Sequence, residues 1–434
     1  MDSSLSKKAI KSLSFLWMGS LLGSGSTFVI YMILARKLGP EDFGVFSSAL
    51  SMVTIFTMLA GFGVGEVWLK LFGKEGWQGI RWIKPSLHFV FISLVGATVL
   101  LAVWALYGSH DKTTQSLLLI MIFFIFGNVA VQLIVSKLQL EERYDYLALW
   151  QLAPNIIRLI IIVICFFILS ISLSVIDIAY IYAGVGALFT IFGIYQLNCM
   201  QKGRFDLKGH EKTMVKEAIT PTLKDIITEA WPFGMASLFA FIYVQSDIIL
   251  IKYLAGDTEA GYYNVAFVII TAILIFPTVL YSKFLMPKFH RWANYDRDKF
   301  YQVYKKGNIA MLVSGSIAMV GILFLSGWMI PLLFGIEYQK SVVLINILAF
   351  TMPIYFVSYS IASTLVTQKH IRKKIKYMGL IAIINIVLNI VLIPYYGANG
   401  AAIATLISYF ILLSVYYYAS QKYVFATEAA KGNK

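Results

Sequence analysis

Charged residues are scarce in this chain of 434 residues. Asp, Glu, Lys and Arg make up 13% of the sequence, whereas soluble globular domains carry about 25%. Hydrophobic residues reach 59%, and the mean hydropathy is +0.76. These values exclude an ordinary soluble domain and predict a polytopic membrane protein.

Cysteines and recognisable catalytic groups are also few. The two cysteines, Cys165 and Cys199, fit neither a disulfide framework nor a metal cluster, and we expect both to be packing residues. The sequence shows no phosphate-binding loop or nucleophile triad, and its outer connections are short. We therefore expect no enzyme, which disfavours a membrane-embedded polymerase or ligase.

Long apolar runs are abundant. Each is long enough to cross a hydrocarbon core of about 30 Å, and such runs must be helices because lipid offers no partner for free backbone groups. Barrel strands would alternate, which these runs do not. Pro154, Pro277 and Pro353 should kink three of the helices. Twelve spans are predicted, at residues 12–34, 43–67, 86–107, 115–136, 147–170, 175–198, 230–251, 260–282, 307–330, 341–366, 377–394 and 398–421.

The basic residues alternate between the connections. Of the 36 Lys and Arg residues, thirty lie at the termini and on the even-numbered connections, and five lie on the odd-numbered ones. The positive-inside rule then places both termini in the cytoplasm. The net charge of +14 therefore reflects the membrane topology, and basic residues on the cytoplasmic side are also attracted to anionic lipid headgroups. We expect no nucleic-acid partner.

A mixed-charge connection divides the chain near its middle. Residues 201–228 carry six basic and four acidic residues and are expected to form a cytoplasmic linker. The predicted domains are an N-terminal six-helix bundle at 1–200 and a C-terminal six-helix bundle at 229–434.

A repeated motif supports this division. Gly39-Pro-Glu-Asp-Phe-Gly-Val-Phe-Ser-Ser-Ala49 is echoed by Gly256-Asp-Thr-Glu-Ala-Gly-Tyr-Tyr-Asn-Val-Ala266, at an offset of 217 residues, half the chain length. We expect the first glycine to end one helix in a left-handed conformation, the acids to cap the next helix, and the second glycine to allow close helix approach. Tight outer hairpins could also converge on such residues.

The same motifs carry a resemblance. Leu34 to Gly44 followed by Gly61-Phe-Gly63, and Asn385 to Pro394 followed by Gly397 to Thr405, resemble the opening hairpin and the last helices of the polysaccharide transporter family. This family contains the O-antigen and capsule repeat-unit (Wzx-type) flippases. It belongs to the multidrug/oligosaccharidyl-lipid/polysaccharide (MOP) exporter superfamily.

The resemblance implies an all-α MOP/MATE-like fold of two pseudo-symmetric six-helix bundles in a bacterial inner membrane. It implies a flippase that moves polyprenyl-pyrophosphate-linked oligosaccharides by alternating access, with polysaccharide polymerase and chain-length proteins as possible partners. A multidrug or cation exporter, or a lipid II exporter, would share the fold. Lipid II flippases usually have two more helices and a basic residue in helix 1, and this sequence has neither.

One arginine belongs to neither set of connections. Arg158 lies near the middle of its span, and Gln151 and Asn155 share its helix face. An arginine at this depth must face a wet or paired interior. Its guanidinium could bind a substrate phosphate, or it could hold its helix to a neighbour through an ion pair or backbone carbonyls.

Asp247 is an acid within the predicted span 230–251, in the second half of the chain. It could bind a coupling proton or sodium ion, or it could contact a basic group of the first half as part of a gate. Local pairing with Lys252 or helix capping is the structural alternative. No other cofactor or metal is expected.

Amide side chains also lie within the spans. Asn385 and Asn389, and likewise Asn128 and Gln132, are spaced four residues apart. They could line a hydrophilic lumen for sugar hydroxyls, but more often such amides hydrogen-bond to neighbouring helices. At the outer end of the first span, Arg36 and Lys37 could receive the emerging pyrophosphate or pair with the adjacent acids.

Overall fold

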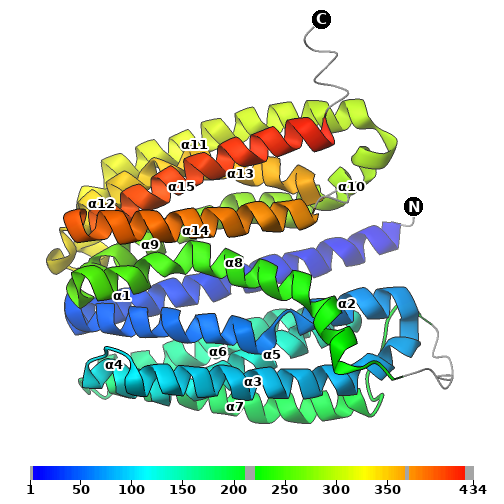
Figure 1. Ribbon diagram of the computed structural model, residues 1–434, viewed down its shortest axis with the longest axis horizontal. Helices are drawn as coiled ribbons and strands as arrows, with labels where there is room; N and C mark the ends of the chain where they lie inside the picture. Colours follow the sequence, from blue (N-terminus) through cyan, green and yellow to red (C-terminus); the bar gives the residue numbers. More distant parts are fainter. Residues whose placement is uncertain (1–2, 211–219, 367–370, 426–434) are drawn as a thin grey trace, which may run out of the picture. The chain divides into compact units, whose positions relative to one another are not determined.

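The structure is a computed structural model that describes residues 3–210, 220–366 and 371–425. Residues 211–219 of the predicted linker lie outside this range. Every regular element in the described ranges is a helix (Figure 1). The chain forms two compact units, one made of Met1–Ile30 and Ser48–Phe241 and the other of Tyr31–Ser47 and Ile242–Lys434.

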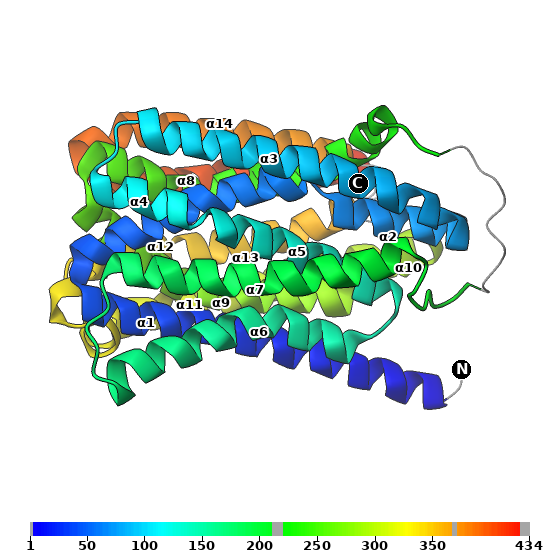
Figure 2. The same ribbon diagram turned by 90° about the horizontal axis from the view of Figure 1, so that it is seen from below.

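Long parallel and antiparallel helices build the first unit. Helix α5 packs along α7, and α6 packs against both, as Figures 1 and 2 show. Two glycines permit this closeness, because a Cβ atom on Gly127 would lie 2.5 Å from the Cα of Gly186. Beyond the shared helices α1 and α8, its elements are α2 (Val64–Glu75), η1 (Gly76–Trp82), α3 (Ile83–Tyr107), α4 (Lys112–Ile120), α5 (Ile122–Leu140), α6 (Tyr144–Val163), η2 (Ile164–Ile168) and α7 (Val175–Gln201).

The second unit is built in the same way. Helix α14 packs along α15, α11 along α13, and α9 against α12. Its elements are α9 (Asp257–Thr278), η3 (Val279–Leu285), α10 (Met286–Tyr295), α11 (Arg297–Phe334), η4 (Ile336–Tyr338), α12 (Ser341–Ala349), α13 (Thr351–Val366), α14 (Ile371–Tyr396), α15 (Ala398–Ala419) and η5 (Ser420–Val424). Two helices contribute to both units, α1 (Ser3–Gly61) and α8 (Leu223–Ala255).

The two units differ from the predicted domains in two places. Tyr31–Ser47 belongs to the second unit, where the Tyr338 hydroxyl donates a hydrogen bond to the Ala35 carbonyl oxygen at 3.1 Å. Residues 229–241 belong to the first unit, where Ala230 joins a buried apolar cluster with Val67 and Leu71. The chain therefore passes between the units inside α1 and α8 rather than at residues 201–228.

The repeated glycine motif forms one close crossing within the second unit. Gly39 and Gly256 lie at helix ends with positive φ angles of 76° and 98°. Their ψ angles are 173° and 170°, so the positive φ is as predicted but the conformation is not the left-handed helical one. A Cβ atom on Gly44 would lie 1.8 Å from the Asp257 carbonyl oxygen, and one on Gly261 would lie 2.0 Å from the Pro40 carbonyl oxygen. Since Asp257 is the repeat equivalent of Pro40, the two copies contact each other reciprocally, and the predicted close approach is confirmed.

The acids of the second copy bind groups outside the motif. Asp257 forms an ion pair with Lys252, and no side chain caps the start of α9 through a hydrogen bond. Glu259 instead accepts a hydrogen bond from the backbone N–H of Ala398 at 3.2 Å, at the first residue of α15. Both acids lie in the first turn of α9, as the motif predicts, but the Glu259 carboxylate also binds the start of a neighbouring helix, α15.

Apolar helices long enough to span a membrane account for the predicted segments. In the described residues there are nine such stretches, or ten when the bent pair α12–α13 counts as one span. One stretch, Leu21–Tyr107, is 87 residues long and contains most of the first three predicted spans. Breaks at Gly39 and Gly63, both with positive φ, and the 3₁₀ segment η1 divide it. The chain is a multi-pass membrane protein, and the number twelve stays a prediction.

Two of the three predicted proline kinks have a structural counterpart. Helices α12 and α13 meet at an angle of 41°, just before Pro353. Pro277 is followed at once by η3, a π-helical segment, as expected where a proline removes a backbone donor. The kink at Pro154 stays a prediction.

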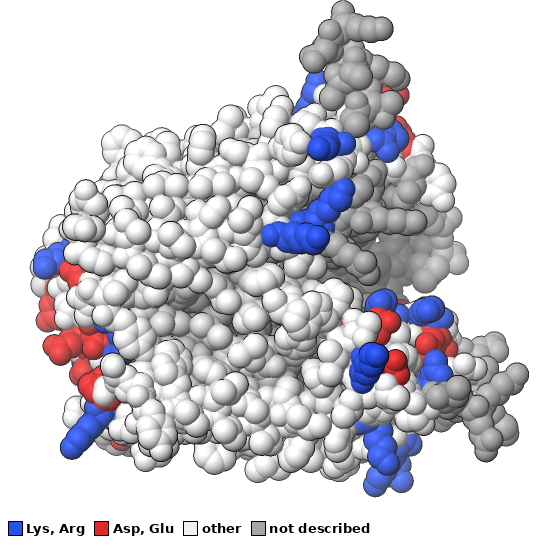
Figure 3. All heavy atoms as spheres, in the orientation of Figure 1, with Lys and Arg blue, Asp and Glu red and all other residues white. Residues whose placement is uncertain are grey.

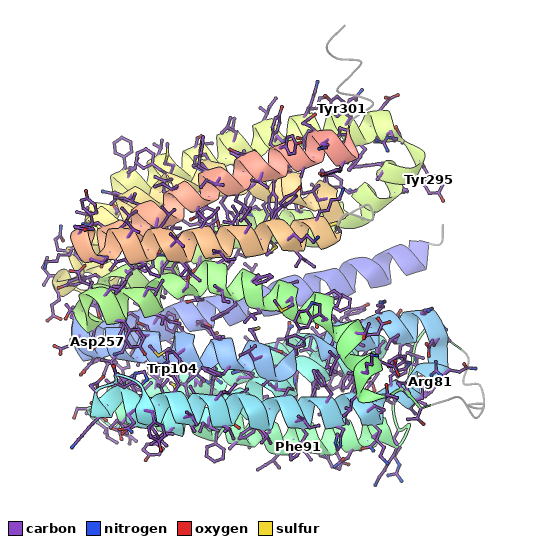
Figure 4. The ribbon with its side chains drawn as sticks, viewed as in Figure 1. Arg81, Phe91, Trp104, Asp257, Tyr295 and Tyr301 are labelled. Carbon is purple, nitrogen blue, oxygen red and sulfur yellow. The ribbon has the colours of Figure 1, made fainter. Side chains whose placement is uncertain are left out.

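The surface of the helices agrees with a lipid environment. In Figure 3, acidic and basic side chains gather near the helix ends, and the helix sides between them carry none on the visible face. Phe91 in the middle of α3 is 64% exposed and points away from its neighbours (Figure 4). Exposed apolar sides of this kind contact hydrocarbon rather than water.

Candidate functional site

A buried carboxylate forms the centre of a polar cluster in the second unit. Asp247 is 1% exposed and accepts three hydrogen bonds. The Tyr263 hydroxyl donates to Oδ2 at 2.6 Å, the Thr405 hydroxyl donates to Oδ2 at 2.5 Å, and Asn389 Nδ2 donates to Oδ1 at 2.7 Å. Three donors offset much of the cost of burying a negative charge.

Four helices supply this Asp247 cluster. Asp247 comes from α8, Tyr263 from α9, Asn389 from α14 and Thr405 from α15. Each residue lies six to eight positions from the helix end at the α8–α9 or α14–α15 turn. At 1.5 Å per residue the cluster is about 9–12 Å from that end of the unit. Asp257, labelled in Figure 4, marks the α8–α9 turn.

The amides of α14 extend the cluster. Asn385 Oδ1 accepts hydrogen bonds from Asn389 Nδ2 at 3.1 Å and from the Ser246 hydroxyl at 3.2 Å. Both asparagines are fully buried. In the described part of the chain, Asn389 Oδ1 and Asn385 Nδ2 are buried without a hydrogen-bond partner. An unsatisfied buried acceptor next to a carboxylate is unusual, because most such groups are paired.

This donor set fits a small hard cation or a proton. A carboxylate, amide oxygens and hydroxyl oxygens are the ligands that hard cations prefer. Asn389 Oδ1 would gain the partner it lacks if such a cation bound beside Asp247. Lys252 forms an ion pair with Asp257, and the hydrogen bonds described at Asp247 come from Tyr263, Thr405 and Asn389. Pairing of Asp247 with Lys252, the predicted structural alternative, stays a prediction.

Arg158 lies inside the first unit, between aromatic rings. Its side chain is 6% exposed, and its guanidinium carbon is 4.6 Å from the ring centre of Tyr182 in α7 and 5.0 Å from that of Phe124 in α5. Nη1 donates to Asn155 Oδ1 at 3.2 Å. Both rings attract the guanidinium by cation–π interaction. The Arg158 side chain therefore links α6 to α5 and to α7. This geometry favours a structural role over phosphate contact, which stays a prediction.

The other amides of the first unit do not gather at one place. Gln151 is exposed and Asn155 is half-buried. Asn128 Nδ2 donates to the Phe124 carbonyl oxygen of its own helix at 3.0 Å. One donor of this amide is thus bound within its own helix, and a role for these amides in a lumen stays a prediction.

Arg36 and Lys37 lie at the tip of the first hairpin, within the second unit. Arg36 Nη2 donates to the Leu332 carbonyl oxygen of α11 at 2.8 Å. The contact fastens the tip to α11. Whether either residue receives a pyrophosphate stays a prediction.

Sequence reasoning missed two members of the Asp247 cluster and one buried ion pair. Tyr263 lies in the repeated motif and Thr405 in the final Gly-Ala-rich motif, so both were in view, but nothing along the chain connects them with Asp247. Lys137 was counted as a cytoplasmic charge, yet it is 5% exposed and pairs with Glu141 at 3.1 Å. Its spacing of four residues from Glu141 was the available signal.

Comparison with known proteins places the chain among glycan transporters. The profile of a family described as "Polysaccharide biosynthesis protein" matches residues 9–292. The capsular polysaccharide biosynthesis protein CapF of Staphylococcus aureus is 20% identical over 411 residues, which cover 94% of this chain and 98% of CapF. The probable flippase AglR of Haloferax volcanii is 27% identical over 417 residues, covering 88% of this chain and 77% of AglR.

Solved structures share the fold. A lipid II flippase MurJ in an inward closed conformation superposes with a TM-score of 0.71 at 16% identity, over 95% of this chain and 88% of that one. An inward-facing MATE transporter of the MOP superfamily superposes with a TM-score of 0.69 at 15% identity, over 97% and 99% of the two chains. The fold is therefore of the MOP type, as predicted.

Proposed function

Because the chain belongs to the polysaccharide biosynthesis protein family, we propose that it is a flippase for polyprenyl-pyrophosphate-linked oligosaccharides, carrying them from the cytoplasmic to the outer leaflet. The observation that carries this proposal is the family match over most of the chain, joined to relatives named for capsular polysaccharide biosynthesis and for glycan flipping. The MOP-type fold is compatible with it and with the alternatives, a multidrug or lipid II exporter.

The reaction needs no bond to be made or broken. The protein lowers the free energy needed to move a charged, hydroxylated headgroup through hydrocarbon, while the polyprenyl tail stays in lipid. In this proposal both termini lie in the cytoplasm and the protein lies in the cell membrane, as the distribution of Lys and Arg suggests. Polysaccharide polymerase and chain-length proteins would receive the product.

The Asp247 cluster is the proposed coupling site. Asp247, Asn389 and Thr405 would hold a sodium ion or, alternatively, Asp247 would carry a proton. The support is a carboxylate, an orphaned amide oxygen and a hydroxyl converging from three helices. A cation or proton bound there would stabilise one arrangement of these helices over another. Coupling of ion binding to transport requires such a difference between conformations. Arg158 has no assigned role in this proposal beyond joining α6 to α5 and α7.

Reconstitution tests the flippase proposal. Proteoliposomes with polyprenyl-pyrophosphate oligosaccharide in one leaflet are probed with a membrane-impermeant glycosidase, so that only transferred headgroups are cleaved. We expect faster transfer than in protein-free liposomes, and a dependence on a sodium or proton gradient. A drug cation or lipid II tested in parallel separates the alternatives. No transfer of the oligosaccharide lipid above the protein-free rate under any gradient would contradict the proposal.

A further inference from the structure

A cavity of about 390 Å³ opens on the first unit between α5, α6 and α7. One wall is a stripe of α6 that includes Trp150, Ala153 and Ile157, spaced three and four residues apart, and the other is a stripe of α7 from Leu188 to Gln196. Lining residues at its mouth are large and exposed, among them Phe192 at 53%. In a membrane these residues face hydrocarbon, so the cavity is a groove open to lipid.

One end of the groove is polar and basic. Both charged residues that line it are cations, Lys137 from α5 and Arg143 at the start of α6. Lys137 Nζ contacts Gln196 Oε1 at 3.0 Å and Glu141 Oε1 at 3.1 Å, so its charge is balanced. Arg143 is exposed, and its guanidinium stacks on Tyr146 with 3.9 Å between guanidinium carbon and ring centre. Among the described residues that line the groove, Arg143 is thus the cation whose charge no lining acid balances, and this end also carries further hydrogen-bond donors.

An indole N–H points to a missing acceptor. Trp150 lines the groove, packs edge-on against Phe189 with 5.1 Å between ring centres, and has a buried Nε1 atom without a hydrogen-bond partner in the described residues. Buried indole N–H groups usually find a partner. Trp150 lies one helical turn from Tyr146 along α6, so its N–H would suit an oxygen just below a headgroup.

The length of the groove suits a hydrocarbon chain. From Tyr146 to Ile157 along α6 is eleven residues, which is about 16 Å at 1.5 Å per residue. A groove with a basic polar end and an apolar course has the form of a phospholipid site. Basic pockets between membrane helices on the cytoplasmic side recognise anionic headgroups.

We propose that this groove binds a phospholipid with an anionic headgroup, with its phosphodiester at Arg143 and Lys137, a glycerol-ester oxygen at Trp150, and one acyl chain between α6 and α7. The single net positive charge of the basic end matches the single negative charge of a phosphodiester such as that of phosphatidylglycerol. Since Lys137 and Arg143 lie on one of the even-numbered connections, which the positive-inside rule assigns to the cytoplasm, the proposed lipid belongs to the cytoplasmic leaflet.

Fluorescence quenching tests the site directly. Delipidated wild-type protein in detergent is titrated with phosphatidylglycerol that carries bromine atoms on its acyl chains, which quench nearby tryptophans. The protein has nine tryptophans, so the signal of interest is the difference between wild type and Trp150→Phe, a change that keeps the packing but removes the reporter. We expect a saturable quenching component that Trp150→Phe loses.

Two further variants test the headgroup and the chain. Arg143→Gln should raise the dissociation constant for phosphatidylglycerol about tenfold, because a charge-assisted contact is lost. Ala153→Leu should reduce binding by filling the groove. Lys305→Gln is the matched control, since Lys305 is another exposed cation stacked on a tyrosine, at 4.6 Å from the Tyr301 ring centre, but lines no part of the groove.

The outcomes separate the proposal from its rivals. Equal quenching by brominated phosphatidylglycerol and brominated phosphatidylcholine would refute selection for an anionic headgroup. Equal effects of Arg143→Gln and Lys305→Gln would refute the site. Displacement by polyprenyl phosphate at a much lower concentration than by phosphatidylglycerol would assign the groove to the tail of a transport substrate instead. Transfer of oligosaccharide lipid is measured separately, so failure of the flippase proposal leaves these results unaffected.

Discussion

Replacing Asp247 with asparagine should abolish a sodium response of the folded protein. Asparagine keeps the size and one acceptor of the side chain but loses the charge. The Tyr263 and Thr405 hydroxyls, which donate to Oδ2, can rotate and accept from the new amide instead. We therefore expect Asp247→Asn to fold, with a cost of about 1–2 kcal/mol from the weaker hydrogen bonds.

The size of the sodium effect follows from ligand linkage. A site with a dissociation constant of about 10 mM stabilises the wild type by about 1.4 kcal/mol at 100 mM sodium. For a chain of this length that corresponds to a rise of about 1–2 °C in Tm. The assay is thermal unfolding in detergent, with sodium chloride compared with choline chloride at equal ionic strength.

Asp257→Asn is the matched control. Asp257 is a second acid of the same unit and pairs with Lys252, but its side chain is 27% exposed and it lies outside the cluster. This variant should keep the full sodium response. A sodium shift of equal size in Asp247→Asn and wild type would refute the cation site. A response of the wild type to pH but not to sodium, absent in Asp247→Asn, would assign the site to a proton.

Three further perturbations test the packing. Gly44→Ala should destabilise the protein by about 1–3 kcal/mol in thermal unfolding, since its Cβ would overlap a backbone carbonyl, whereas Gly23→Ala, with open space around it, should not. Arg158→Met should lower the free energy of unfolding by about 1–3 kcal/mol, because the cation–π contacts are lost. It should leave the rate of oligosaccharide transfer unchanged. A stable variant that no longer transfers the oligosaccharide would support the phosphate-contact hypothesis instead. Lys137→Met should lower the free energy of unfolding by about 3–5 kcal/mol, because it leaves Glu141 buried and unpaired. The double variant Lys137→Met/Glu141→Leu should regain most of this stability. A double variant as unstable as Lys137→Met would contradict the pairing.

Much of the fold could be predicted from the sequence. Apolar length and the requirement for paired backbone groups place the helices, and the repeated motif correctly predicted a close approach at Gly44 and Gly261. These features depend on residues near one another in the chain. The division into units could not be predicted, because it depends on which helix the tip at Tyr31–Ser47 packs against.

The candidate site was predicted only in part. Asp247, Asn385 and Asn389 were recognisable because a polar residue inside an apolar span is conspicuous. Their partners were not, since Tyr263 and Thr405 are ordinary residues of membrane helices until four helices bring them to one carboxylate. The aromatic surroundings of Arg158 were hidden for the same reason, because helical periodicity describes one helix and not its neighbours.

The shared helices α1 and α8 have a mechanical consequence. The chain crosses from one unit to the other three times, after Ile30, after Ser47 and after Phe241, and each crossing lies within a helix. The units are thus joined at these three places by helical backbone and not by a flexible loop. In the flippase proposal, a change between conformations would therefore have to bend or rotate α1 and α8 themselves.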